Sequence, residues 1–285
     1  MYRVADSTRG PFHAVQLFDD ASGSRVTLVP SRGALATSFV ARGREWLYLD
    51  EGTLLDATQN VRGGIPVLFP SPGRLENDRY ECAGKSGAMK QHGFARASVF
   101  REVGRGDVGS AWVEMELADT AATRAVFPFG FRLRLRFALR GATLSLSAAV
   151  HNTGVGPLPF ALGYHPYFAV ALAEKARCKI PSRATRAWDN VRKREIALGP
   201  IDLATSEVDL HLLDHDSNGA TLETVSGTVD LGGNFTHWVI WTLPEREFVC
   251  LEPWSAPRNA LNSREGLVTL GPGEERRFGL ELAVR

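Results

Sequence analysis

The stretch from Phe131 to Val150 alternates between apolar and polar side chains with a period of two. Its first half, FRLRLRFALR, sets five apolar residues against a row of arginines (Phe131, Leu133, Leu135, Phe137 and Leu139 against Arg132, Arg134, Arg136 and Arg140). After the turn RGA, apolar residues recur at Leu144, Leu146, Ala148 and Val150. Because successive side chains of a strand point to opposite faces, this pattern predicts a β-hairpin with one buried and one polar face. We interpret the arginine row as a solvated face.

Shorter strand-like runs follow the same rule along most of the chain, with Gly- and Pro-rich turns between them (RVTLVP, ATSFVAR, WVEMEL, HWVIWTL, FVCLE and RRFGLELAV). No long helical stripe appears, although PLPFALGYHPYFAVALAEKA could end in a short helical turn. Many short strands joined by turns are typical of an antiparallel sandwich or barrel. No repeat or linker divides the sequence, so we expect residues 1–285 to form a single all-β domain, a large antiparallel β-sandwich.

Charge and cysteine content narrow the class of protein. The formal net charge of +1 gives no support for nucleic acid or an anionic membrane as a partner. Cys82, Cys178 and Cys250 are widely spaced, which argues against a disulfide framework and favours a reducing compartment. The first residues lack the apolar core of a signal peptide, and no stretch has the length of a membrane helix. We therefore expect a cytoplasmic protein.

Two motif-like strings lack the context that their chemistry requires. GRGDVG, from Gly104 to Gly109, lies between two strand-like runs, whereas a dinucleotide site needs it to open a helix. HLLDHD places His211 and His215 four residues apart, but no helix is evident and a third ligand is missing. We therefore interpret the first as a hairpin loop and expect no metal at the second.

Four other stretches combine polar side chains with Gly, Pro and aromatic residues (RGGIPVLFPSPGR, KQHGFAR, ALGYHPYF and CLEPW). Glycine lets a backbone approach a ligand closely, proline stiffens a loop, and an aromatic ring offers a flat face to the C–H face of a sugar. Within them Glu252 follows an apolar run, where a carboxylate is costly to bury without a partner. The four stretches together predict one polar site.

The motifs HGFAR, LGYHPYF and FVCLEPW, in this order and spacing, resemble the aldose 1-epimerase, or galactose mutarotase, family. The resemblance runs from about Val26 to the last strand and is nearest to shorter bacterial mutarotase-like members. It implies an antiparallel β-supersandwich and the interconversion of the α and β anomers of an aldose, without cofactor or metal. Ring opening needs a base for the C1 hydroxyl and an acid for the ring oxygen, and a carboxylate and a histidine suit these roles.

By this resemblance Glu252 matches the base, His165 the acid, and His92 a second histidine that binds near the ring oxygen. The resemblance and the residue types also point to a set of substrate-binding residues, namely Arg62, Arg74, Arg96, Asp214 and Trp254. If the mechanism applies, the side chains of His165 and Glu252 must lie within about 10 Å of each other, so that both reach one sugar ring.

The identity of the substrate stays open at this stage. A free hexose, a hexose 6-phosphate bound through Arg62 and Arg96, and a non-catalytic carbohydrate-binding protein on the same fold are the alternatives. We favour a neutral aldose as the small-molecule partner and expect a monomer or weak dimer.

Overall fold

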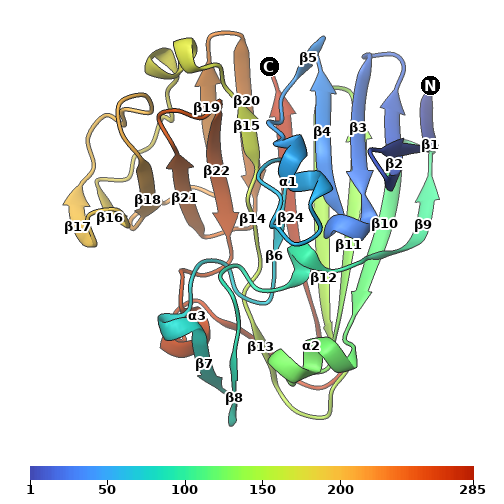
Figure 1. The fold of residues 1–285 in the computed structure, drawn as a ribbon, viewed down its shortest axis with the longest axis vertical. Helices are drawn as coiled ribbons and strands as arrows, with labels where there is room; N and C mark the ends of the chain where they lie inside the picture. Colours follow the sequence, from blue (N-terminus) through green and yellow to red (C-terminus); the bar gives the residue numbers. More distant parts are fainter.

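The computed structural model describes residues 1–285 and consists mainly of antiparallel β-sheets, as the sequence predicts (Figure 1). A sheet of seven strands, one of eight and one of five make up the body of the molecule, and two smaller sheets have two strands each. The predicted all-β sandwich architecture is therefore confirmed.

The predicted hairpin forms the middle of the seven-stranded sheet. Leu135 faces Ala148 across it, and the apolar side chains are buried while the arginine face is polar. On that face Arg134 donates to Glu116 at 2.8 Å, and the Arg136 guanidinium lies 3.8 Å from the Trp112 ring centroid. In spatial order the strands are β19 (Gly219–Thr224), β20 (Gly227–Gly233), β24 (Glu275–Val284), β12 (Thr143–Asn152), β11 (Phe131–Arg140), β10 (Ala111–Ala118) and β9 (Arg101–Gly106).

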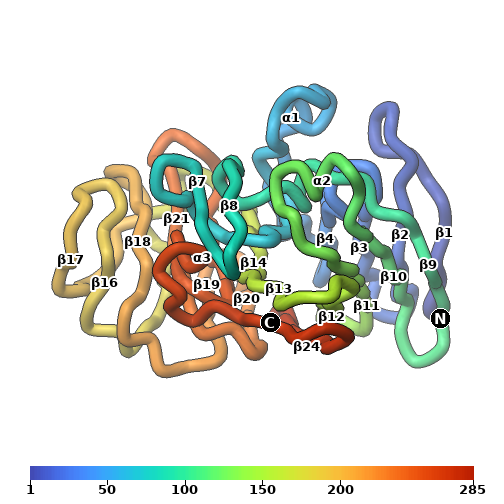
Figure 2. The backbone as a smooth tube through the Cα atoms, turned by 90° about the horizontal axis from the view of Figure 1, so that it is seen from below, coloured from blue at the N-terminus to red at the C-terminus, as the bar shows by residue number.

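The five-stranded sheet is a meander at the N-terminus. Its second strand packs on β10 and β11, and the two layers face each other at the right of Figure 2. Its strands are β1 (Tyr2–Arg9), β2 (Phe12–Asp19), β3 (Ser24–Val29), β4 (Leu35–Ala41) and β5 (Arg44–Glu45).

The eight-stranded sheet carries the cavity described below. In β22, Val249 and Leu251 point into the hydrophobic core, so Cys250, Glu252 and Trp254 point to the opposite face. The sheet comprises β17 (Arg194–Ala197), β16 (Arg186–Asp189), β18 (Val208–Leu212), β21 (His237–Thr242), β22 (Phe248–Trp254), β14 (Gly163–Tyr164) and β6 (Val67–Leu68), with β15 (Tyr167–Ala169) paired to β22.

Short elements fill the connections. Two small sheets pair β13 (Leu158–Phe160) with β23 (Val268–Leu270) and β7 (Arg79–Cys82) with β8 (Lys85–Ala88). The helices are α1 (Glu51–Leu55), α2 (Ala121–Val126) and α3 (Ala260–Ser263), with 3-10 turns η1 (Pro30–Arg32), η2 (Glu76–Asp78), η3 (Ala95–Ala97) and η4 (Leu172–Arg177). The last turn is the helical segment expected after the YHPYF motif.

One hydrophobic cluster of 63 buried residues joins the three large sheets. The GRGDVG string lies at the end of β9 and in the turn before β10, which confirms the hairpin interpretation. HLLDHD begins in the strand β18 and contains no helix. The helices are all too short and polar to cross a membrane. The interpretation of residues 1–285 as a single domain stays a prediction.

Candidate active site

A cavity of about 430 Å³ opens on the exposed face of the eight-stranded sheet, and only five of its 20 lining residues are hydrophobic. It is lined from strands β18, β21 and β22 and from the loops that carry the RGGIP, GR and HGFAR motifs. Seven of the eight predicted site residues line it, namely Arg62, Arg74, His92, Arg96, His165, Glu252 and Trp254.

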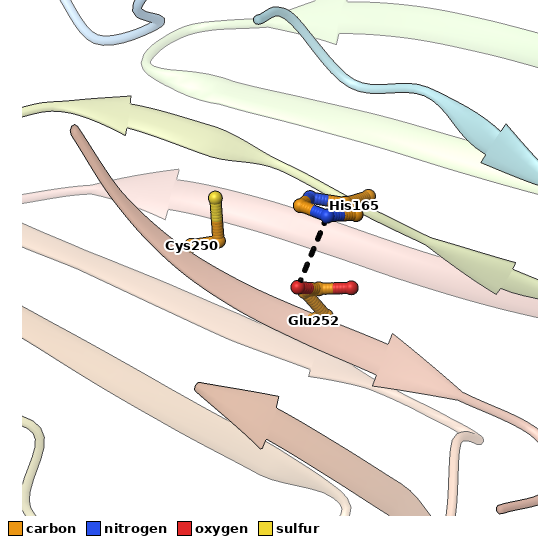
Figure 3. Close-up of side chains that lie close together, drawn as sticks. All are labelled: His165, Cys250 and Glu252. Carbon is orange, nitrogen blue, oxygen red and sulfur yellow. Dashed lines mark ion pairs between the residues drawn. The ribbon is translucent and has the colours of Figure 1, made fainter. Parts of the chain in front are cut away.

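Glu252 and His165 meet at the floor of this cavity. Glu252 is the fifth residue of β22, and His165 lies between β14 and β15, which both pair with β22. Their side chains point toward each other, with His165 Nε2 3.3 Å from Glu252 Oε1 (Figure 3). Only 2% of Glu252 and 6% of His165 are exposed. The ring of His165 stacks on Tyr167 at 4.6 Å, which fixes its plane.

Burial acts against charge on both partners. It raises the pKa of Glu252 well above its ordinary value and lowers the pKa of His165 to about 3. The positive charge of Arg96 lowers both pKa values but is a smaller influence than burial. The two groups can therefore share one proton as a neutral pair at pH 7, and the ion-paired form is higher in free energy.

His92 is held as a hydrogen-bond donor by the backbone. Its Nδ1 accepts a hydrogen bond from the Gly73 N–H at 3.0 Å, so in the neutral ring the proton is on Nε2. Burial lowers the pKa of His92 well below its ordinary value, which keeps the ring neutral. The next residue has to be glycine, because a Cβ on Gly93 would lie 2.2 Å from the Phe69 carbonyl oxygen. The HG pair thus allows the loop to pack closely.

Trp254 supports Glu252 from the other side. Its indole N–H donates to Glu252 Oε2 at 3.2 Å, while its ring stacks on His237. The sequence predicted Trp254 as a substrate-binding residue, and the structure adds a hydrogen bond that orients the carboxylate.

A second polar cluster in the cavity was missed from the sequence. His211 Nδ1 lies 3.0 Å from His237 Nε2, and His211 Nε2 lies 3.8 Å from Asp209 Oδ1. The other oxygen of Asp209 accepts from the Asn190 side-chain amide at 2.7 Å. Burial raises the pKa of Asp209 and lowers the pKa of His211 to about 3. A sugar hydroxyl between His211 and Asp209 could accept from the first and donate to the second.

Asp214, the predicted acidic binding residue, does not line the cavity. Its carboxylate accepts hydrogen bonds from the backbone N–H groups of Thr185 at 2.9 Å and Arg186 at 3.0 Å, so it fixes a turn instead. The acidic residue that lines the cavity from this segment is Asp209. Period-two alternation through VDLHL was the available signal, because Leu210 and Leu212 enter the core and turn Asp209 and His211 toward the cavity.

Cationic side chains outnumber carboxylates around the cavity, with Arg62, Arg74, Arg96, Lys193 and Arg258 against Glu207, Asp209 and Glu252. Arg62 and Arg96 are close enough to His165 to lower its pKa, whereas Lys193 and Arg258 have this effect on His211. Arg74 is exposed and lies 3.9 Å from Asp78. Arg96 is partly buried, and its Nη2 donates to the Gln91 carbonyl at 2.8 Å.

Residues 16–283 match the family model for aldose 1-epimerase. Among solved structures, the Slr1438 protein of Synechocystis sp. PCC 6803 is 33% identical, with a TM-score of 0.93 over 100% of this chain and 99% of that one. A galactose mutarotase-like protein of Clostridium acetobutylicum is 19% identical, with a TM-score of 0.85 over 100% of this chain and 98% of that one. This likeness shows the shared fold. A Cenchrus ciliaris protein provisionally named glucose-6-phosphate 1-epimerase is 26% identical over 277 residues, or 85% of this chain and 76% of that protein.

Proposed function

Because the chain belongs to the aldose 1-epimerase family, we propose that its cavity interconverts the anomers of a hexose with Glu252 and His165 as the two proton-transfer groups. The observation that carries this proposal is their 3.3 Å approach at the floor of a polar cavity. The distance is well inside the limit of about 10 Å that the sequence analysis set, and both groups can reach one sugar ring.

The proposed reaction moves one proton at each end of the C1–O5 unit. Glu252 takes the proton of the C1 hydroxyl, and protonated His165 gives its proton to the ring oxygen as the C1–O5 bond breaks. The open chain has an aldehyde at C1 and a hydroxyl at C5. After rotation about C1–C2 the same groups reverse their roles, and the ring closes on the other face of the aldehyde.

Burial of the pair sets which protonation state is stable before and after ring opening. Before ring opening, the pair must be a carboxylate and an imidazolium, which the buried floor of the cavity disfavours. Ring opening converts it to a carboxylic acid and a neutral imidazole. The buried floor therefore favours the protonation state that ring opening produces, while forming the ion pair from the neutral resting pair is part of the barrier.

His92 and Trp254 assist as positioned hydrogen-bond donors. The Nε2 of His92 lies 3.2 Å from the Gln91 side-chain amide, and its N–H can turn from that contact to the ring oxygen or to the oxygen at C1, where negative charge can develop. Trp254 keeps Glu252 oriented through Oε2 and leaves Oε1 at the His165 side. A non-catalytic sugar-binding protein would have no need for this pair of groups at reacting distance.

The distribution of cations supports a hexose 6-phosphate as the second candidate substrate beside a neutral aldose. C6 is attached to C5, next to the ring oxygen that His165 protonates, so a 6-phosphate would lie on the His165 side. Arg62 and Arg96 are the cations on that side. Arginine suits phosphate because its planar group can donate two parallel hydrogen bonds. The Cenchrus ciliaris relative, by its name, points the same way.

A comparison of kcat/KM for glucose and glucose 6-phosphate decides between the two candidates. If phosphate is the handle, Arg96→Ala should reduce kcat/KM for the phosphate about tenfold or more relative to any change for glucose, since a hydrogen bond to a charged group contributes roughly 1.5–3 kcal/mol. Arg258→Ala, on the far side of the cavity, is the matched control. A preference of the native protein above about a hundredfold for the phosphate, or about 2.7 kcal/mol, would exclude a neutral aldose as the main substrate.

The polarimetric assay on fresh α-glucose and α-glucose 6-phosphate tests the activity itself. The protein should shorten the time to the equilibrium rotation for at least one of them. We also infer a cytoplasmic location, which the three free, buried cysteines support, and keep the expectation of a monomer or weak dimer.

A further inference from the structure

A buried thiol lies beside the proton-transfer pair and has no part in the proposed reaction. Cys250 precedes Glu252 by two residues in β22, so both side chains point to the same face of the sheet. Figure 3 shows the thiol beside the His165 ring and next to Glu252. The sulfur, one imidazole nitrogen and one carboxylate oxygen all lie within 4.8 Å of one another, and all three residues are buried.

We propose that Cys250, His165 and Glu252 form an inhibitory site for a soft divalent cation, with Zn²⁺ as the best match. The inhibitory effect of the site rests on the proposed function of His165 and Glu252. The binding of metal to the site does not depend on that function. Thiolate, imidazole and carboxylate are the three ligand types of protein zinc sites. With bonds of about 2.0–2.3 Å, ligand atoms around tetrahedral zinc lie roughly 3.5 Å apart, so small side-chain rotations bring this group to the required geometry.

The imidazole is free to take a metal. Nδ1 of His165 is buried and has no hydrogen-bond partner, while Nε2 faces Glu252. Nε2, which contacts Glu252, can offer its lone pair to the ion once the shared proton leaves. The carboxylate also keeps Oε1 free of any donor other than His165.

The ion can reach this group from the cavity, because His165 and Glu252 both line it. Cys250 lies beside them, packs with Tyr167 and Phe248, and provides the ligand farthest from solvent. The fourth position of a tetrahedral ion then faces the cavity, where water or a sugar oxygen can occupy it.

Binding would block catalysis by occupying the lone pairs that transfer protons. The zinc–sulfur bond forms as the thiol proton leaves to solvent, together with the proton that Glu252 and His165 share, and no oxidation state changes. Because the metal competes with these protons, inhibition should strengthen as pH rises. Burial raises the pKa of Cys250 well above its ordinary value, so the unliganded thiol keeps its proton.

The inhibition test uses zinc chloride on the full chain and follows the anomerisation rate, with each variant compared with its own zinc-free rate. Native protein should lose activity with zinc and recover it with EDTA. Cys250→Ser should need at least about ten times more zinc for the same inhibition, because loss of even an outer-shell partner of a metal ligand costs 10–100-fold in affinity. Cys178→Ser is the matched control, since this buried thiol lies away from the cavity and donates to the Glu174 carbonyl. Equal zinc sensitivity of Cys250→Ser and native protein overturns the proposal.

Direct binding of Co²⁺, a spectroscopic substitute for zinc, separates this site from the proposed activity. The thiolate-to-cobalt absorption band should appear in native protein and in Cys178→Ser, and be lost in Cys250→Ser. Binding with this band in a protein that proves inactive on every sugar would sink the proposed function but leave the metal site standing. No thiolate band in native protein means that Cys250 is not a ligand, and the proposal fails even if catalysis is normal.

Discussion

His165 Nε2 lies 3.3 Å from Glu252 Oε1, and both side chains are almost completely buried at the floor of a polar cavity. A buried acid and base at this distance share their protons as a unit, so their titration belongs to the pair. The carboxylate is further held by the indole N–H of Trp254. The predictions below test what each of these contacts contributes.

Glu252→Gln should lower kcat by about 10²-fold or more, because the amide keeps the shape but cannot accept a proton, and a lost general base costs about 10²–10⁴. His165→Asn should have a similar effect through loss of the acid. Steady-state anomerisation kinetics check both. Glu207→Gln is the matched control, since Glu207 also lines the cavity but is exposed at its edge. Near-normal turnover in Glu252→Gln, with an unchanged melting temperature, would rule out the proposed base.

Trp254→Phe should move the alkaline limb of the kcat profile to higher pH, by about one unit. That limb reports loss of the last proton of the pair, which leaves a Glu252 carboxylate beside neutral His165. The indole N–H stabilises this carboxylate and lowers its pKa, so removing a hydrogen bond of about 1.5 kcal/mol raises it. The plateau rate should fall as well, because the reactive form also contains the carboxylate.

The pH–rate profile of Trp241→Phe provides the comparison. Trp241 lines the same cavity, but its indole N–H donates to Glu207 at 3.3 Å. Its alkaline limb should stay in place. A shift of the same size in both variants would mean that loss of ring packing, and not the hydrogen bond to Glu252, changes the titration.

Three buried histidines and the partly buried His237 should make the protein sensitive to acid. Burial lowers the pKa of His165 and His211 to about 3 and of His237 to about 4, and it lowers that of His92 as well. In the unfolded chain these histidines have pKa values near 6.5. Below that pH the unfolded chain therefore binds more protons than the folded protein. Their contribution to stability is present above about pH 6.5 and is lost as pH falls toward 3 to 4.

At pH 5 this linkage lowers the free energy of unfolding by about 2 kcal/mol for each of His165 and His211, relative to pH 8. Urea unfolding between pH 8 and pH 5 measures it. His211→Gln removes one titrating group and should flatten the pH dependence by about that amount, whatever its effect at pH 8. An unchanged slope would show that His211 is protonated in the folded protein.

Much of this fold and site follows from local patterns. The alternation through Phe131–Val150 predicted the hairpin of β11 and β12, because only one register of the two strands places all of their apolar side chains in the core. Glu252 stood out because a carboxylate inside an apolar run needs a partner. That partner is 87 positions away in His165, and strand pairing between β15 and β22 brings the two segments together.

What the sequence concealed depends on contacts between distant segments. Asp214 and Asp209 lie in the same short stretch. The alternation of VDLHL indicates two faces, and the packing of Leu210 and Leu212 in the core shows that the other face, with Asp209, lines the cavity. The hydrogen bond of His211 to His237 crosses from β18 to β21. Cys250 was noted from the sequence only as one of three scattered cysteines, and its place beside His165 comes from the pairing of β22 with β15.

Asp209→Asn should raise KM more than it lowers kcat. Asp209 Oδ1 and His211 Nε2 are 3.8 Å apart in the cavity, which suits a hydroxyl that accepts from the imidazole and donates to the carboxylate. A hydrogen bond to a charged group contributes roughly 1.5–3 kcal/mol, so KM should rise about tenfold or more. The contacts of the proton-transfer pair are kept, but loss of the Asp209 charge lowers the pKa of Glu252. Native protein and variant are therefore compared at their own pH optima, where turnover at saturation should stay within a few-fold. Asp214→Asn is the matched control, because its carboxylate only fixes the turn at Thr185 and Arg186. If Asp214→Asn raises KM while Asp209→Asn does not, the sugar binds elsewhere in the cavity than between Asp209 and His211.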